Sequence, residues 1–269
     1  MSLEGCVQAF HFGNDGQRCF GQFHPAEAGN RVRPAVLICG PIGEEGIRAH
    51  RMLRILAERL AASGSPTLRF DYFGTGDSYG DCGDLSLETI QRDILCAHEE
   101  LVDMTQAARV VWIGLRLGAT GALVAAQKPA RGPAGIVLWD PVLNGQAYLA
   151  ELARAHASTP GIGAAAPSPN GQQIHEALGF KISPELWNGL DDMNSIHLKR
   201  KPTKRALILT SGATTQIANL EQTLEHLEVV IDKAYDPAEA NWNSDNAMNS
   251  YFIPNQTINT LVEAIEGWR

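Results

Sequence analysis

The chain has 269 residues, of which 44% are hydrophobic and 19% are charged. This composition is ordinary for a globular protein and supports a sizeable core, and the length fits either one large α/β domain or two average domains. The 30 acidic and 22 basic residues give a net charge of -8, which disfavours a nucleic-acid partner because such proteins need a basic face.

The cysteines and the hydropathy pattern exclude further classes. There are 5 cysteines, an odd number without metal-like spacing, which argues against both a disulfide framework and a zinc site. We see neither a signal-peptide pattern nor a run of the ~18 apolar residues that a membrane span needs. Neither a Walker motif nor G-x-G-x-x-G follows any predicted strand. We therefore expect a cytoplasmic protein with no metal, no cofactor and no membrane span.

The first half of the chain predicts a hairpin followed by alternating strands and helices. The hairpin strands, 7–13 and 18–25, flank the turn sequence NDGQ. Apolar runs and helical spacing then predict the next elements. The expected strands are 34–40, 66–74, 108–114 and 134–140, and the expected helices are 50–64, 84–104 and 116–127.

The alternation is interrupted after residue 140. A helix at 147–157 precedes a Pro/Gly/Ala/Ser stretch at 158–173 that has no core-forming pattern. Ser183 and Pro184 then predict the start of a helix at 183–196, as its N-cap and first residue. The expected elements that follow are strands at 205–212 and 228–236 and helices at 214–227 and 255–268.

This order of elements predicts an α/β fold. Strands that alternate with helices indicate a mostly parallel sheet with helices on both faces. A leading hairpin, βα units and an insertion after the sixth strand match the layout of α/β hydrolases, with an eight-stranded sheet and a small helical cap. We expect residues 1–144 and 204–269 to form the core and residues 145–203 to form the cap.

One turn of this layout carries an unexpected residue. Residues 110–120 read VVWIGLRLGAT, in which Gly114 and Gly118 are spaced as in G-x-S-x-G, the strand-to-helix elbow that presents a nucleophilic serine. Arg116 stands at the serine position. A guanidinium keeps its proton at physiological pH and has no lone pair for attack, so the nucleophile is missing from its expected place.

Five segments together indicate a particular group of proteins. They are GLRLGA (114–119), RFDYFGTGDSYGD (69–81), PIGEEG (41–46), WDPVLNGQAYLAEL (139–152) and LGFKISPEL (178–186). From about Val32 onward the chain resembles the α/β-hydrolase-like proteins associated with bacterial exosortase A systems, which are similar to serine-aminopeptidase-type hydrolases. The resemblance implies the α/β-hydrolase fold and a hydrolase.

The remaining triad residues are also missing from their expected places. A triad of this fold runs Ser, Asp/Glu, His along the chain, but Thr210 and Ser211 stand where the acid should follow the seventh strand. Asp140, after the sixth strand, is either a substitute acid or a loop carboxylate that caps backbone amides. Residues 236–257 contain no histidine, and only His50 and His175 are expected to approach the site.

The oxyanion hole needs backbone groups only, and these are retained. We expect its N–H donors to be Leu117 and either Ile42 or Gly43. Arg116 adds a positive charge at a helix N-terminus, which already favours anions. This predicts an anion site at the elbow.

An internal or an external anion can fill such a site. The internal candidates are Glu44 and Glu45, in the loop after the third strand, with Asp71 or Asp140 nearby. We favour this alternative because a buried arginine is costly unless it is paired. The external alternative is a carboxylate or phosphate.

Three functions remain open. We favour a non-catalytic member that binds a small acyl or carboxylate-bearing ligand, with Trp242 lining a partly apolar pocket. The second is a hydrolase or acyl-transfer enzyme in which Asp140 or Glu45 acts as base and Arg116 polarises a carbonyl. The third is a structural subunit of a polysaccharide or natural-product pathway, with a protein partner or a homodimer. In the loop after the fourth strand, we expect Ser78 to form turn contacts, and Cys82 as nucleophile is a remote alternative.

Overall fold

The computed structural model describes residues 6–26, 33–128, 132–159, 176–235 and 254–268. Within them, eight strands form one sheet in the order β1-β2-β4-β3-β5-β6-β9-β10. β1 and β2 pair antiparallel, as do β2 and β4, and all other neighbours are parallel. The strands are β1 (Gln8–Phe12), β2 (Cys19–His24), β3 (Ala35–Cys39), β4 (Thr67–Asp71), β5 (Val110–Leu115), β6 (Gly135–Trp139), β9 (Arg205–Thr210) and β10 (Val230–Tyr235).

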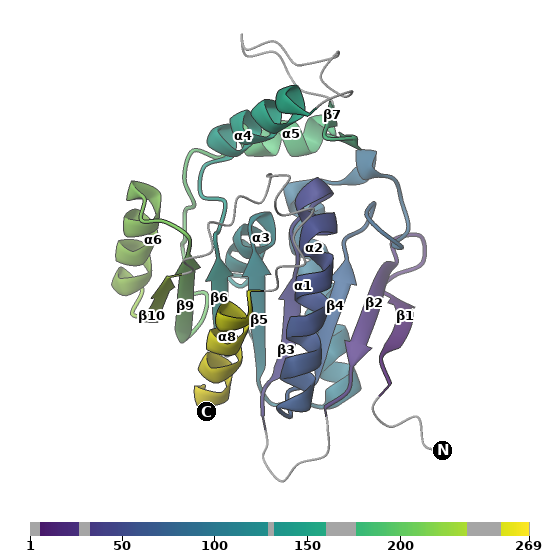
Figure 1. Cartoon of the computed structure of the whole chain (residues 1–269), viewed down its shortest axis with the longest axis vertical. Coiled ribbons are helices and arrows are strands. Elements are labelled where there is room, and N and C mark those ends of the chain that lie inside the picture. Colours follow the sequence, from purple (N-terminus) through teal and green to yellow (C-terminus); the bar gives the residue numbers. More distant parts are fainter. Residues whose placement is uncertain (1–5, 27–32, 129–131, 160–175, 236–253, 269) are drawn as a thin grey trace.

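Helices cover both faces of this sheet, which confirms the predicted α/β class (Figure 1). α1 (Gly43–Ala62) and α8 (Asn255–Gly267) cover one face, and α2 (Leu87–Thr105), α3 (Leu117–Ala125) and α6 (Thr215–His226) cover the other. Successive strand residues contribute to opposite cores, so that in β3 Val36 packs toward α1 while Leu37 packs toward α2. This explains why the central strands read as unbroken apolar runs.

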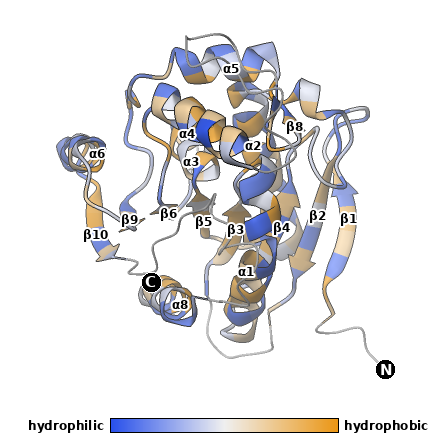
Figure 2. Ribbon diagram, turned by 45° about the horizontal axis from the view of Figure 1, so that its top comes forward, coloured by the Kyte–Doolittle hydropathy of each residue, from blue (hydrophilic) through white to orange (hydrophobic). Residues whose placement is uncertain are grey.

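The hydropathy of the elements follows the same division. Figure 2 shows hydrophobic residues along the central strands and mixed hydrophilic and hydrophobic residues along the helices. Among the described residues, no helix combines the length and the apolar character that crossing a bilayer requires.

The described part of segment 145–203 lies across one end of the sheet (Figure 1). It consists of α4 (Gly145–Ser158), the strands β7 (Glu176–Ala177) and β8 (Phe180–Lys181), and α5 (Pro184–Asp191). Ser183 caps α5 by accepting a hydrogen bond from the backbone N–H of Leu186, as predicted. The β7–β8 hairpin was not predicted, because strands of two residues are too short to show a period.

The start of α1 corrects one expectation. The helix begins at Gly43 rather than near His50, so Glu44 and Glu45 lie in its first turn and not in a loop. Two glycines, Gly43 and Gly46, conceal the helix in the sequence because glycine is a poor helix former. The two glutamates instead favour it, since carboxylates are stabilised near a helix N-terminus.

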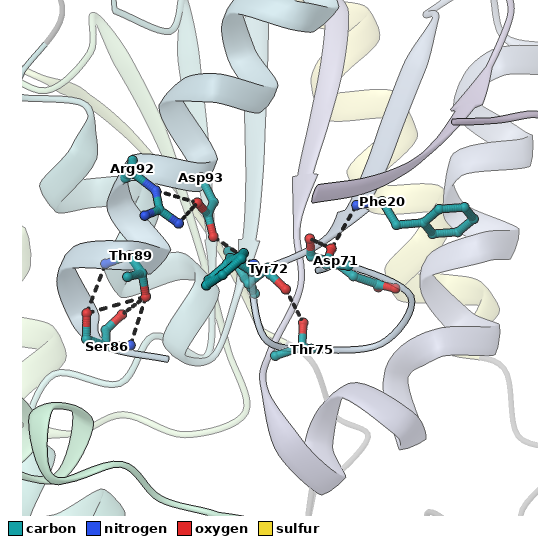
Figure 3. A network of polar contacts seen from close by, with 10 residues as sticks. Phe20, Asp71, Tyr72, Thr75, Ser86, Thr89, Arg92 and Asp93 are labelled. Carbon is teal, nitrogen blue, oxygen red and sulfur yellow. Dashed lines mark hydrogen bonds and ion pairs between the residues drawn. The ribbon is translucent and has the colours of Figure 1, made fainter. Parts of the chain in front are cut away.

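The loop after β4 is held by hydrogen bonds to its own and neighbouring backbone (Figure 3). Ser78 Oγ donates to the carbonyl of Asp71 and accepts from the N–H of Phe20. The Asp71 carboxylate accepts from the N–H of Asp77, and Asp93 of α2 accepts from the N–H of Phe73. Ser78 therefore has the turn contacts predicted for it.

Cys82 lies further along the same loop, at the start of the short 3-10 helix η1 (Cys82–Asp84). Its Sγ lies 3.4 Å from the carboxylate of Asp81. This neighbour is an anion, and a catalytic thiolate is activated by cations instead. The contact therefore gives no support to Cys82 as a nucleophile.

A buried histidine predicts how stability depends on pH. Arg69 Nε of β4 donates to His24 Nε2 of β2 over 3.2 Å, and burial, followed by the charges of Arg69 and Arg54, lowers the pKa of His24 to about 4. Because the unfolded chain binds this proton more readily, stability is lost as the pH falls from about 6.5 through about 4. The loss expected at pH 4 is about 3 kcal/mol.

Urea unfolding of wild type and His24→Gln at pH 7 and pH 4 tests this. The glutamine in the variant cannot titrate. Between pH 7 and pH 4, the free energy of unfolding of the variant should therefore fall by about 3 kcal/mol less than that of wild type. His226→Gln, which changes an exposed histidine of α6, should behave like wild type. Equal acid sensitivity of wild type and His24→Gln would contradict the assignment.

Candidate functional site

The β5–α3 connection has the shape of a nucleophile elbow. Arg116 alone joins the two elements, with φ 53° and ψ -122°, a strained conformation for a residue other than glycine. A Cβ on Gly114 would lie 2.3 Å from the Cα of Ala119, and one on Gly118 would lie 2.3 Å from the carbonyl oxygen of Cys39. The two glycines thus permit the tight turn, and an arginine occupies its apex.

The guanidinium of Arg116 is held by carboxylates from two directions. Nε donates to Glu45 Oε1 of α1 over 2.9 Å, and Nη2 donates to Glu151 Oε2 of α4 over 2.8 Å. The hydroxyl of Tyr148, also on α4, donates to Glu45 Oε2 over 3.0 Å, and the Tyr148 ring lies 5.4 Å from the guanidinium carbon. We call these four residues the Arg116 cluster. The predicted pairing of Arg116 with Glu44 or Glu45 is confirmed for Glu45.

Burial and charge set the protonation of the cluster. The side chains of Glu45, Arg116 and Glu151 are 1%, 12% and 36% exposed. Burial raises the pKa of Glu45, and the charge and hydrogen bond of Arg116 oppose this rise. Burial alone would lower the pKa of Arg116, but the two carboxylates outweigh it and hold the pKa above its usual range. The guanidinium therefore stays charged.

The protonation of Tyr148 completes this network. Burial and then the charge of Glu45 raise its pKa well above the usual value. Tyr148 consequently keeps its proton and acts as a hydrogen-bond donor to Glu45.

Asp140 makes the backbone contact of the second of its two predicted roles, and its role as a substitute acid stays a prediction. It follows β6 with φ 41°, and its Oδ1 accepts hydrogen bonds from the backbone N–H of Ser211 over 2.8 Å and from Ser211 Oγ over 3.1 Å. The carboxylate thus caps the backbone just after β9. Ser211 stands in the place where this fold otherwise has its acid.

Two cavities meet at the Arg116 cluster. The larger, of about 480 Å³, is lined by residues of the elbow, α4 and the loop after β9, among them Arg116, Asp140, Tyr148, Glu151, Arg154 and Ser211. We call it the Arg116 cleft. The smaller, of about 50 Å³, is mostly apolar, and Ile42, Gly43, Leu85, Tyr148 and Phe180 are among its lining residues. Tyr148 borders both.

The other predicted site residues lie apart from Arg116 or are buried. Glu44 forms an ion pair with Arg48 over 3.1 Å and borders the smaller cavity together with Ile42 and Gly43. It points elsewhere than Glu45 because consecutive helical residues differ in direction by about 100°. Leu117 is fully buried in the core, so its side chain is closed to a ligand.

The backbone N–H groups of Leu117 and Gly43 are the first of α3 and α1, positions that a helix leaves without an intrahelical partner. An oxyanion role for them stays a prediction. The Asp71 carboxylate, expected near Arg116, is engaged in the loop after β4. The charged groups that act on His50 of α1 are Arg69, Asp71, Arg54 and Asp77, and Arg116 is not among them.

Trp242 and His175 lie outside the described residues, as do residues 236–253 of the loop that lacks histidine. Within the described ranges, no group of three His, Cys, Asp or Glu side chains is placed to hold a metal ion.

The sequence indicated the elbow but not its partners on α4. Tyr148 and Glu151 are three residues apart, so they lie on one face of their helix. This spacing can be read from the sequence, but it does not indicate what the face contacts. The sequence does not show that this face of α4 packs against the elbow.

Comparisons with known proteins identify the fold. No protein-family model and no curated protein matches the chain, whereas many solved structures do. Est1E from Butyrivibrio proteoclasticus is 15% identical over 97% of this chain and 98% of its own, with a TM-score of 0.63. An esterase from Pyrococcus furiosus, PF2001, is 12% identical over 99% and 92%, with a TM-score of 0.66. XC6422 from Xanthomonas campestris, described as an α/β serine hydrolase without lid, is 15% identical over 97% and 93%, with a TM-score of 0.53.

The chain therefore has the α/β-hydrolase fold, as predicted. The likeness at these identities concerns the fold alone. The resemblance to exosortase-associated proteins stays a prediction from the sequence.

Because the Arg116–Glu45 pair is buried, removal of the Glu45 charge should lower the stability of the protein strongly. Glu45→Gln removes the buried charge and leaves Arg116 with the partly exposed Glu151, so we expect a loss of about 3 kcal/mol in the free energy of unfolding. Chemical denaturation measures it. Glu58→Gln, in the same helix, breaks the exposed i,i+4 pair with Arg54 and should cost about 1 kcal/mol or less.

The triple variant Glu45→Leu/Arg116→Met/Tyr148→Phe supplies a further control. Removal of both charges and of the hydroxyl that donates to Glu45 leaves neither an uncompensated buried ion nor an unpaired buried donor, so it should recover most of the stability that Glu45→Gln loses. Equal losses for Glu58→Gln and Glu45→Gln would contradict the assignment of Glu45 as the buried counter-ion.

Proposed function

We propose that this chain is a non-catalytic protein with the α/β-hydrolase fold that binds a small carboxylate-bearing ligand in the Arg116 cleft. The observation that carries the proposal is the arginine at the apex of the elbow, hydrogen-bonded to Glu45 and Glu151. A side chain that cannot attack and is neutralised internally has replaced the group on which serine-hydrolase chemistry depends.

The surroundings of the elbow support the absence of catalysis. Ser211 occupies the acid position and binds Asp140, and residues 236–257 contain no histidine. Glu45 is 1% exposed, and its two oxygens accept from Arg116 and Tyr148. A general base must reach the proton that it abstracts, so this burial argues against Glu45 as the base of an alternative mechanism.

The chemistry of the Arg116 cleft supports a carboxylate ligand. Its volume of about 480 Å³ falls within the range usual for small-molecule sites. Arg116 and Arg154 are among its lining residues, as are the acidic residues Asp140 and Glu151. Guanidinium groups favour carboxylates, with which they form charge-assisted hydrogen bonds.

Segment 145–203 is, on this proposal, a cap over the ligand site, with residues 1–144 and 204–269 as the core. Support comes from α4, which supplies Tyr148 and Glu151 to the cluster and Arg154 to the cleft. Membership of the exosortase-associated group, and with it a structural role in a polysaccharide or natural-product pathway, stays a prediction that no observation favours.

The absence of catalysis is tested with p-nitrophenyl esters and a fluorophosphonate probe. We expect neither turnover nor labelling by wild type, and none by Arg116→Ser, because a serine without a base at the elbow is not activated. An active serine esterase serves as positive control. Ester turnover that disappears in a folded Arg116→Ala variant would overturn the proposal.

Ligand binding is tested by thermal shift with small carboxylic acids, each compared with its amide. Ferulic acid is the first probe, since a solved structure with this fold, that of Est1E (TM-score 0.63, 18% identity), has it bound. A carboxylate that binds the folded state raises the Tm, and the amide should raise it less.

Two variants on α4 provide the matched comparison. Ala147 is exposed and lines the cleft, so Ala147→Trp should fill it and abolish the shift. Ala150→Trp changes an exposed alanine of the same helix that is not among the lining residues, and it should keep the shift. Equal shifts with acids and amides, or no shift with any acid, would overturn carboxylate binding.

A further inference from the structure

The two carboxylates of the Arg116 cluster differ in how firmly they are held. Glu45 is 1% exposed and lies in the first turn of α1, where both Arg116 and Tyr148 donate to it. Glu151 is 36% exposed, borders the Arg116 cleft and meets the guanidinium at Nη2. Glu45 is thus closed to a ligand, whereas Glu151 lies at the Arg116 cleft, where a ligand can reach it.

The free-energy cost of exchanging a carboxylate of the cluster for a ligand carboxylate is much higher for Glu45 than for Glu151. Removal of Glu45 would leave a buried guanidinium and a buried phenol without their acceptor, which costs several kcal/mol. Glu151 is 36% exposed, so its carboxylate is already partly hydrated and can turn toward solvent at a lower cost than a buried carboxylate. A ligand carboxylate on Nη2 would restore the contact that Glu151 gives up.

Charge within the cluster also favours exchange at Glu151. Two carboxylates face one guanidinium, and the charge of Glu151 contributes to the raised pKa of Glu45. Arg154 lies three residues after Glu151 and lines the same cleft, so a cation stands one helical turn away from a displaced Glu151 side chain.

Resting on the proposed function, we propose that Glu151 is an internal competitor for the ligand: a ligand carboxylate takes its place on Nη2 of Arg116. Glu45 and Tyr148 stay in place and hold the guanidinium for either occupant. The affinity for carboxylates is therefore set by how readily Glu151 gives way.

The experiment compares acetate binding by wild type, Glu151→Gln and Glu185→Gln. Acetate is a small carboxylate with no other polar group, so it tests the anion position without demands on the rest of the cleft. Glu185 is exposed on α5, is not among the cleft residues and lies in the same segment. Both variants make the same change in net charge, so only a local effect distinguishes them. Affinity is measured by titration calorimetry or by the Tm against sodium acetate, with sodium chloride at equal ionic strength.

We expect Glu151→Gln to bind acetate at least tenfold more tightly than wild type, and Glu185→Gln to match wild type. Arg116→Lys in the Glu151→Gln background keeps a cation but lacks Nη2, and it should reverse most of the gain. Both results would support Glu151 as the competitor.

Other outcomes separate the two proposals. If wild type binds acetate and Glu151→Gln binds it equally or less tightly, the competitor role is overturned while the proposed function stands. If Glu151→Gln and Glu185→Gln gain affinity equally, the effect is general electrostatics and the competitor role is again overturned. If neither wild type nor Glu151→Gln binds acetate or ferulic acid, both proposals are overturned.

Discussion

The site of this protein depends on a buried cation that must be neutralised. The elbow after β5 directs its apical side chain to the end of the sheet where the first turn of α1 and the face of α4 converge, and here that side chain is the guanidinium of Arg116. An unpaired buried charge costs several kcal/mol. Glu45 meets this requirement from the core, and Tyr148 fixes the second oxygen of Glu45.

The elbow itself does not depend on the residue at its apex. Gly114 and Gly118 permit the close approach of β5, α3 and the end of β3, and these contacts involve backbone atoms. The fold can therefore keep its most strained turn while the chemistry at that turn changes. This is the structural reason why a likeness to esterases in fold carries no reaction with it.

Two contacts of the Arg116 cluster connect α4 to the sheet and its helices. Glu151 and Tyr148 come from α4, and both end at the Arg116–Glu45 pair. Tyr148 also separates the polar Arg116 cleft from the smaller apolar cavity that it borders. The Arg116 cluster thus forms part of the lining of the cleft and connects α4 to the elbow.

The sequence by itself determined the elements and the most informative residue. The eight-stranded α/β fold followed from the apolar period, from caps such as Ser183 and from the alternation of strands and helices. The spacing of two glycines placed Arg116 at the elbow. Both could be predicted because these signals act within a few residues of the chain. The tertiary structure decided the partners. Whether Glu44 or Glu45 faces Arg116 depended on where α1 begins, which its glycines concealed. The contacts of Arg116 with Glu151 and of Asp140 with Ser211 join residues 35 and 71 positions apart, and such contacts follow from how whole elements pack, which no local pattern records.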